Sequence, residues 1–177
     1  MRRCLLRCSI PPKSPTPINP RVPSFDIYEV ADNPSDGRMV RVSYVGQGQV
    51  VVSHYPQTGP RKPNPQDPTP QFDLTQRSSL HFRLHEVGEM VAVAEGKVPM
   101  ASFHGDKSFI TYQRDKSIDH CYVLEVIRTH SAGDPSGPTA PTAALSAQSF
   151  RVPFQRHFLI MWHAFLEAAI KDSFGFD

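Results

Sequence analysis

The fold of this 177-residue chain is decided by its last stretch, SFRVPFQRHFLIMWHAFLEAAIKDSF, residues 149–174. Its apolar residues recur at the i, i+3, i+4 spacing of an amphipathic helix: Phe158, Met161, Trp162, Phe165, Leu166, Ala169 and Ile170. A short strand, 150–152, leads through Pro153 into this helix, and Gly175 stands where a left-handed C-cap is expected. Burying each large apolar side chain is worth about 1.5–3 kcal/mol. The helix must therefore lie on a sheet or against another chain.

The preceding residues supply strands for such a sheet. Alternating apolar and polar residues predict strands at 25–30, 38–45, 49–55 and 77–84 and, after a short helix at 86–96, at 101–104, 109–114 and 120–128. With the strand at 150–152, the order is four strands, a helix, four strands and a helix. This order suggests two similar halves.

The N-terminal segment differs in composition from the rest. Residues 1–25 carry five basic and no acidic side chains, whereas the remainder carries 14 basic and 17 acidic ones. Residues 1–9 are typical of a mitochondrial transit peptide, with an ordinary basic tail as the alternative, and 10–24 hold six prolines, as a stiff linker does. We therefore expect a transit peptide and linker at 1–24 and one domain at 25–177. Within the domain, 56–71 and 129–148 are expected to be mobile loops.

Catalytic and metal-binding patterns find no support in the sequence. His85-Glu86 begins a zinc-protease motif, but Glu89 occupies the place of its second histidine. His120 and Cys121 are neighbours in a predicted strand and point to opposite faces, so Cys121 is expected in the core. There is no phosphate-binding glycine loop and no nucleophile elbow. We expect no enzyme activity, no metal and no cofactor.

The strongest candidate site is a basic and hydroxyl-bearing sheet face. Residues 37–85 have a net charge of +4, although the domain as a whole is slightly acidic. We expect phosphate contacts from eight residues on or beside the strands: Arg38, Arg41, Ser43, Arg77, Ser79, Arg83, Arg114 and Lys116. Such a face suits phosphate binding without base reading. A solvated face kept polar for solubility would show the same pattern. Tyr44 falls on the opposite, inward face with Val40 and Val42.

Two stretches in register resemble the Whirly family. The first is SLHFRLHEVGEM, residues 79–90, continuing to Phe103-His104-Gly105; the second is Phe150-Arg151-Val152-Pro153 followed by the helix with Phe158, Trp162 and Phe165. The family includes plant single-stranded-DNA-binding proteins and kinetoplastid mitochondrial RNA-binding proteins that bind guide RNAs. The plant members carry a basic motif near the first strand, where this chain has the acidic FDIYEV, residues 25–30. The resemblance therefore favours the kinetoplastid branch.

This resemblance implies an α+β fold of two four-stranded antiparallel sheets with two helices. It also implies a protein of the mitochondrial matrix that binds guide RNA and mRNA through backbone phosphates. Such a protein promotes annealing in uridine insertion/deletion RNA editing, as part of a heterotetramer with a related chain. Because the last helix has more large apolar residues than one face needs, we expect Phe158, Trp162 and Phe165 at the oligomer interface. The alternatives are an organellar single-stranded-DNA-binding protein and a structural subunit that contacts protein only.

Overall fold

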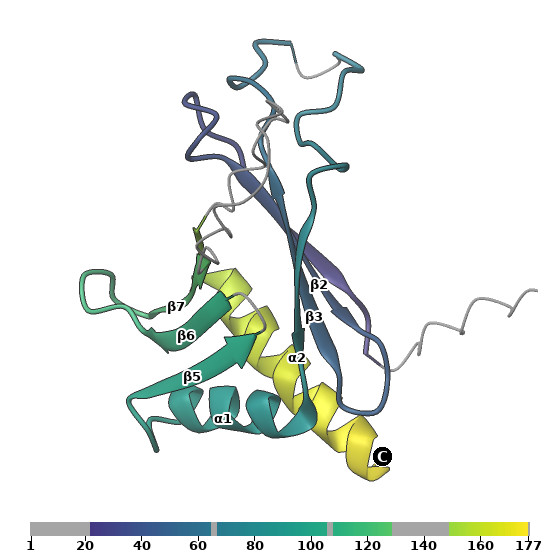
Figure 1. Ribbon diagram of the computed structural model, residues 1–177, viewed down its shortest axis with the longest axis vertical. Helices are drawn as coiled ribbons and strands as arrows, with labels where there is room; N and C mark the ends of the chain where they lie inside the picture. Colours follow the sequence, from purple (N-terminus) through teal and green to yellow (C-terminus); the bar gives the residue numbers. More distant parts are fainter. Residues whose placement is uncertain (1–21, 65–66, 106–107, 129–148, 177) are drawn as a thin grey trace, which may run out of the picture.

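The computed structural model describes residues 22–64, 67–105, 108–128 and 149–176, and it has the expected order of elements (Figure 1). The first half comprises β1 (Phe25–Glu29), β2 (Arg38–Tyr44), β3 (Val50–Pro56), β4 (Ser78–Phe82) and α1 (Leu84–Ala94). The second comprises β5 (Met100–Gly105), β6 (Ser108–Arg114), β7 (Cys121–Arg128), β8 (Phe150–Gln155) and α2 (His157–Phe174). The predicted α+β class and element order are confirmed.

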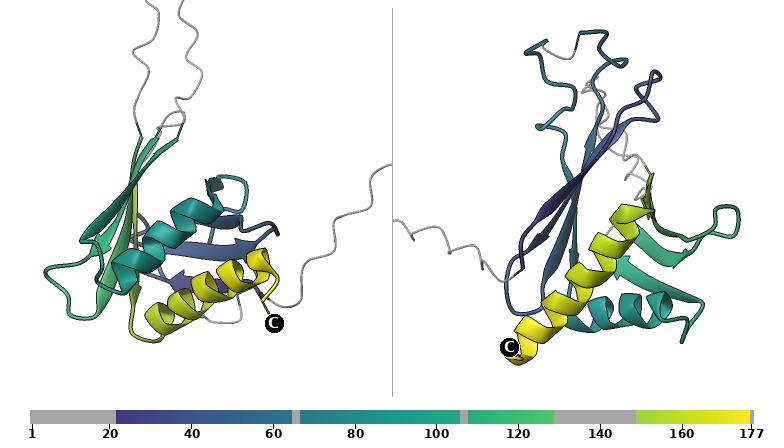
Figure 2. Two further views of the ribbon diagram at one scale, coloured as in Figure 1. Left: turned by 90° about the horizontal axis from the view of Figure 1, so that it is seen from below. Right: turned by 180° about the vertical axis from the view of Figure 1, so that it is seen from behind.

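Each half forms its own antiparallel sheet in sequence order. Sheet 1 is β1-β2-β3-β4 and sheet 2 is β5-β6-β7-β8. The two helices lie on the same side of sheet 2, and α2 runs across the space between the sheets (Figure 2). In the described part of the chain, no helix lies on the opposite face of sheet 2. We call the face of each sheet that points away from the core its outer face.

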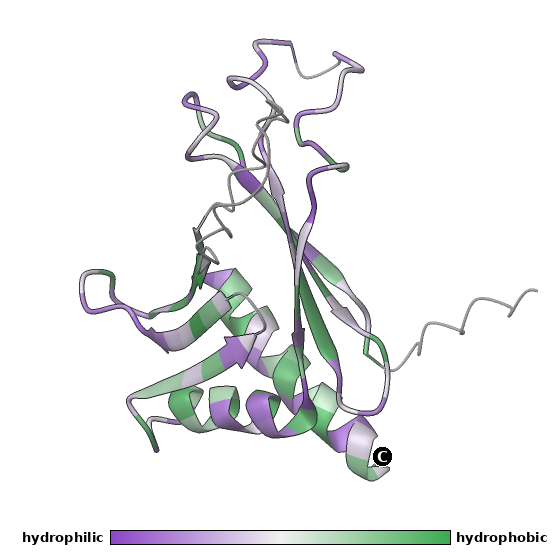
Figure 3. Ribbon diagram, viewed as in Figure 1, coloured by the Kyte–Doolittle hydropathy of each residue, from purple (hydrophilic) through white to green (hydrophobic). Residues whose placement is uncertain are grey.

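One continuous core joins the inner faces of the two sheets to both helices. Its fully buried side chains include Val40 and Phe82 from sheet 1, Tyr112 and Phe154 from sheet 2, and Trp162 from α2. In Figure 3 the hydrophobic colour is concentrated in the central strands and the helices, while the projecting loops are mostly hydrophilic. The apolar faces that the sequence pattern predicts for the strands and the helices therefore pack against one another within the chain.

Local boundaries differ from the predicted ones for identifiable reasons. β4 ends at Phe82, and α1 begins at Leu84 because the Glu86 carboxylate accepts a hydrogen bond from the Arg83 backbone N–H (2.6 Å) at the N-terminus of the helix. β8 runs through Pro153, which pairs with Val123; an edge strand tolerates a proline, which has no N–H to donate. The predicted left-handed cap is confirmed at Gly175, where φ is 69°.

The long β3–β4 connection is anchored at its base. Phe72 packs on the outer face of sheet 1 against Met39 and Tyr55, forming a second small core. The Thr58 N–H donates to the Gln71 carbonyl at 3.0 Å, and this contact closes the base of the loop. The mobility of this loop stays a prediction. The predicted transit peptide and the loop at 129–148 lie outside the described residues.

Candidate nucleic-acid interface

The outer face of sheet 1 brings together the predicted polar residues of β2 and β4. Arg41 and Ser43 alternate with the buried Val40 and Val42, and the register aligns Arg41 with Ser53 of β3 and Ser53 with Ser79 of β4. The hydroxyls of Ser53 and Ser79 are hydrogen-bonded at 2.9 Å. A row of one cation and two hydroxyls therefore crosses three strands.

Arg41 is not free on this face. Its Nε and one terminal nitrogen donate to the two carboxylate oxygens of Asp26 on β1, both at 2.8 Å. This bidentate pairing lowers the pKa of Asp26 and raises that of Arg41, so both groups are charged at neutral pH. Arg41 remains 47% exposed, but any phosphate that binds it competes with Asp26.

The available positive charge lies along β4. Arg77, Ser79, His81 and Arg83 occupy alternate positions, with Arg77 just before the strand and Arg83 just after it. His81 and both arginines are exposed, and neither arginine forms an ion pair with a described residue. Alternate residues of a strand lie about 6.4–6.8 Å apart on the same face. This β4 row is thus an open strip of donors on an edge strand.

Arg38 does not belong to this face, which corrects its assignment as a phosphate ligand. It stands three residues before Arg41 and therefore points inward. Its Nε lies 2.6 Å from the Glu29 carboxylate, and its terminal nitrogens donate to the carbonyls of Asp36 and of Arg151 on β8. Arg38 connects the two sheets and is only 23% exposed.

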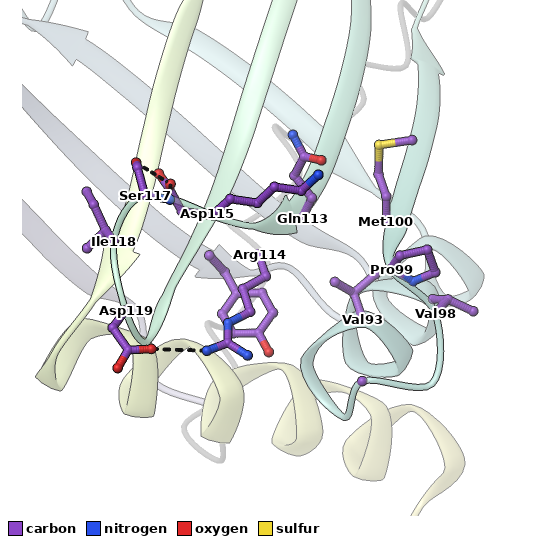
Figure 4. A pocket seen from close by; sticks show the side chains of 13 residues that line it. Val93, Val98, Pro99, Met100, Gln113, Arg114, Asp115, Ser117, Ile118 and Asp119 are labelled. Carbon is purple, nitrogen blue, oxygen red and sulfur yellow. Dashed lines mark hydrogen bonds and ion pairs between the residues drawn. The ribbon is translucent and has the colours of Figure 1, made fainter.

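Arg114 and Lys116 lie apart from the β4 row, at the β6–β7 hairpin. Arg114 forms an ion pair with Asp119 at 3.1 Å, while Lys116 has no ion pair with a described residue. Both residues line a hollow of about 950 Å³ between this hairpin and the α1–β5 turn, where Val98 and Met100 form the opposite wall (Figure 4). The eight predicted residues therefore fall into a sheet 1 group, a hairpin group and the inward Arg38.

Two of the helix residues assigned to the oligomer interface, Trp162 and Phe165, also need correction, whereas the place of Phe158 at the interface stays a prediction. Trp162 is fully buried within the single chain: it stacks on Phe154 with ring centroids 4.4 Å apart and donates to the Tyr112 hydroxyl at 3.0 Å. Phe165 is buried as well, and Phe158 is half-buried against the core. These positions are occupied by contacts inside the chain because the inner stripe of α2 covers both sheets.

Other apolar side chains of α2 are exposed, on a side of the helix that also carries the exposed Glu167 and Lys171. Ile160 is 72% exposed and Phe174 is 61% exposed, and Met161 and Ala164 lie on the exposed side between them. Large exposed apolar side chains are candidates for a protein–protein contact where they form a contiguous patch. None of the helices in the described part of the chain is long and apolar enough to cross a membrane.

Two sequence inferences about single residues hold. Tyr44 is buried; its hydroxyl accepts a hydrogen bond from the Gly48 N–H at 3.1 Å, so it is a core residue and not a stacking platform. Cys121 is a buried thiol, and burial raises its pKa. Among the residues that the structure describes, no cluster of three or more His, Cys, Asp or Glu side chains is placed to hold a metal ion.

The sequence analysis missed an aromatic group on the outer face of sheet 2. His104 of β5 is aligned with Phe109 of β6, and Phe109 with Ile127 of β7. The rings of His104 and Phe109 lie 5.1 Å apart at 51°, and Ile127 is 46% exposed. The signal was present in the adjacent Phe103 and His104, since only one of two neighbouring strand residues can face the core.

The family model of the mitochondrial RNA binding protein MRP matches residues 19–175 of the chain. The chain belongs to this family of mitochondrial RNA-binding proteins. A crystal structure of MRP1/MRP2 from Trypanosoma brucei is 30% identical, with a TM-score of 0.66, over 87% of this chain and 95% of that one. No curated protein sequence matches the chain.

A second solved structure, a guide-RNA-binding protein complex bound to a guide RNA, is 19% identical to the chain. Its TM-score is 0.65, over 87% of this chain and 93% of that one, and at this identity the likeness shows the fold alone. The predicted resemblance to the kinetoplastid mitochondrial RNA-binding proteins is confirmed by the MRP family match.

Proposed function

We propose that this MRP-family chain acts in the mitochondrial matrix, where it binds guide RNA and mRNA and promotes their annealing in uridine insertion/deletion editing. The proposal rests on the family match together with the unpaired cations of the β4 row. Arg77 and Arg83 flank Ser79 and His81 on an exposed edge strand, so charge and hydroxyl donors alternate along one line. Contacts of this kind hold phosphates and carry no sequence information.

Annealing follows from binding one strand by its backbone. An RNA whose phosphates contact arginine side chains loses part of its charge repulsion toward a complementary strand. Its base edges remain free for pairing, since the β4 row offers hydroxyl and cationic groups that suit phosphates and do not read base edges. The proposed role of the chain is therefore to bring two complementary RNA strands together and not to catalyse a reaction.

A salt titration by fluorescence anisotropy tests this function. Each phosphate neutralised on a single strand contributes about −0.7 to the slope of log affinity against log salt. We expect the slope to be at least as steep as two such phosphate contacts would give. The affinities for oligouridine and oligoadenine should be similar. A DNA oligomer of equal length measures the single-stranded-DNA alternative. A wild-type protein with no RNA affinity, or with a flat salt response, would refute the proposal.

The related structures lead us to propose a partner chain as well. The solved structure of MRP1/MRP2 is named for two proteins, and the exposed apolar side chains of α2 offer this chain a surface for such a partner. Ile160, Met161 and Phe174 would be covered when a second Whirly-fold chain packs its own α2 against them. Four such chains, two of each kind, would form the heterotetramer expected from the sequence.

Native mass spectrometry of the chain, alone and with its related partner, tests the assembly. Ile160→Glu places a charge in the contact and should dissociate the hetero-oligomer, because an unpaired buried charge is strongly unfavourable. Leu74→Glu is the matched control, since Leu74 is exposed to a similar degree but lies in the β3–β4 loop. An unchanged oligomer in the Ile160 variant would show that α2 is not the contact.

A further inference from the structure

The outer face of sheet 2 carries side chains that a solvated sheet face does not need. His104, Phe109 and Ile127 come from three neighbouring strands and stand side by side in register. His104 and Ile127 are exposed and Phe109 is half-buried, so ring faces and an aliphatic side chain meet solvent together. The helices lie on the other side of this sheet (Figure 2).

From this geometry we infer that His104 and Phe109 form a stacking platform for an unpaired RNA base, with Ile127 as its apolar border. Aromatic side chains on the open face of a four-stranded antiparallel sheet are a recurrent solution for binding unstacked bases. Every base has a π-face, so such a platform binds any base without reading its edges. A base stacked by its face also keeps its pairing edge free, as annealing requires.

The platform and the β4 row lie on the outer faces of two sheets whose strands meet in the core. Phe82, at the end of β4, contacts Phe103 of β5 with ring centroids 5.6 Å apart. Arg83 follows Phe82 and His104 follows Phe103, so the cation of one sheet and the ring of the other come from strands that meet at this contact. Because neighbouring residues of a strand point to opposite faces, Arg83 and His104 lie on the outer faces of their own sheets, and an RNA that contacts both must span the two faces.

This inference rests on the proposed RNA binding but makes a separate claim. Phosphate contacts weaken as salt rises, whereas stacking persists at high salt. Stacking also requires the base itself. An abasic strand keeps every phosphate and offers no ring, so the platform should distinguish it from oligouridine while the β4 row should not.

The experiment measures the affinity of the full-length protein for an oligouridine of about a dozen nucleotides and for an abasic strand of equal length. The wild type should prefer oligouridine by about 5- to 150-fold, the range for one stacked base. Phe109→Leu and His104→Gln should reduce that preference without changing the salt slope. Ile118→Ala is the control, since Ile118 has a similar exposure to Ile127 but lines the hollow beside the helices.

The outcomes separate the two claims. If the wild type binds neither strand, RNA binding itself fails. If it binds both strands equally, or if Phe109→Leu keeps the full preference, the platform is refuted and phosphate binding stands. Thermal unfolding followed by circular dichroism shows whether each variant is folded; Phe109→Leu retains an apolar side chain at this half-buried position and should stay folded.

Discussion

The outer faces of the two sheets have the same architecture but different chemistry. Sheet 1 presents hydroxyls and cations, of which Arg41 is paired with Asp26 while Arg77 and Arg83 have no ion-pair partner among the described residues. Sheet 2 presents rings and an aliphatic side chain at one end, around Phe109, and charged side chains farther along the same face, Glu125 and Arg151. The number of cations on a face therefore overstates the charge available to a ligand, because acidic neighbours pair with some of them, as Asp26 does with Arg41.

The largest effect is expected from breaking the core that both faces share. Trp162→Ala should lower the free energy of unfolding by about 3–5 kcal/mol, because it removes a fully buried indole and leaves the Tyr112 hydroxyl without its donor. Chemical denaturation measures the loss. Trp162→Phe should cost less, since it keeps a ring on Phe154. An alanine variant of wild-type stability would mean that Trp162 is not a core residue.

The next effect separates free from paired cations. Arg77→Ala with Arg83→Ala should reduce the salt slope of RNA binding by about 1.4, the share of two phosphates, whereas Arg41→Ala should change it by less than about 0.7. Anisotropy titrations at several salt concentrations give the slopes. Lys97→Ala, a change at an exposed lysine beside the α1–β5 turn, serves as the control. Equal salt slopes for the Arg41 and Arg83 variants would show that pairing with Asp26 does not reduce the contribution of Arg41 to RNA binding.

A smaller effect should come from releasing Arg41. Asp26→Asn removes the carboxylate that holds the guanidinium, so RNA should bind more tightly and the salt slope should steepen by up to about 0.7. Asp26→Glu keeps the charge and should leave the slope near the wild-type value. Weaker binding by the asparagine variant would indicate that Asp26 orients Arg41 toward the RNA instead of withholding it.

The same pair gives a pH dependence with a definite sign. The pKa of Asp26 is lowered in the folded protein, below the usual value of about 3.9. Its contribution to stability is therefore fully present above that value and is lost as pH falls through the folded pKa. Between pH 6 and 8 the ion pair should be constant, so any change of RNA affinity in this window must come from another group.

The period of the hydrophobic pattern was sufficient to predict the order of the elements and their buried faces, whereas the arrangement in two four-stranded sheets was implied by the resemblance to the Whirly family. Alternation placed Val40, Val42 and Tyr44 inward, and the 3.6-residue period placed Trp162 and Leu166 on one stripe; the structure buries all five. The same rule should have excluded Arg38, since residues three apart on a strand lie on opposite faces. Its assignment to the site rested on charge alone.

Other features of the site could not be predicted from the sequence. The pairing of Asp26 with Arg41 depends on the register of β1 against β2, which no local pattern determines. α2 has apolar residues on two sides, and only the packed structure shows that Trp162 faces the core while Ile160 is exposed. Both features are determined by contacts between elements that are far apart in the sequence.

The most direct test of RNA binding by the two outer faces is photo-cross-linking of the protein to an RNA containing 4-thiouridine, with the linked peptides located by mass spectrometry. We expect cross-links on β4 and at the β5–β6 edge, around His81 and Phe109, and a loss of the latter when Phe109 is replaced by leucine. Cross-links confined to the exposed apolar side chains of α2, around Ile160, would contradict RNA binding by the sheets.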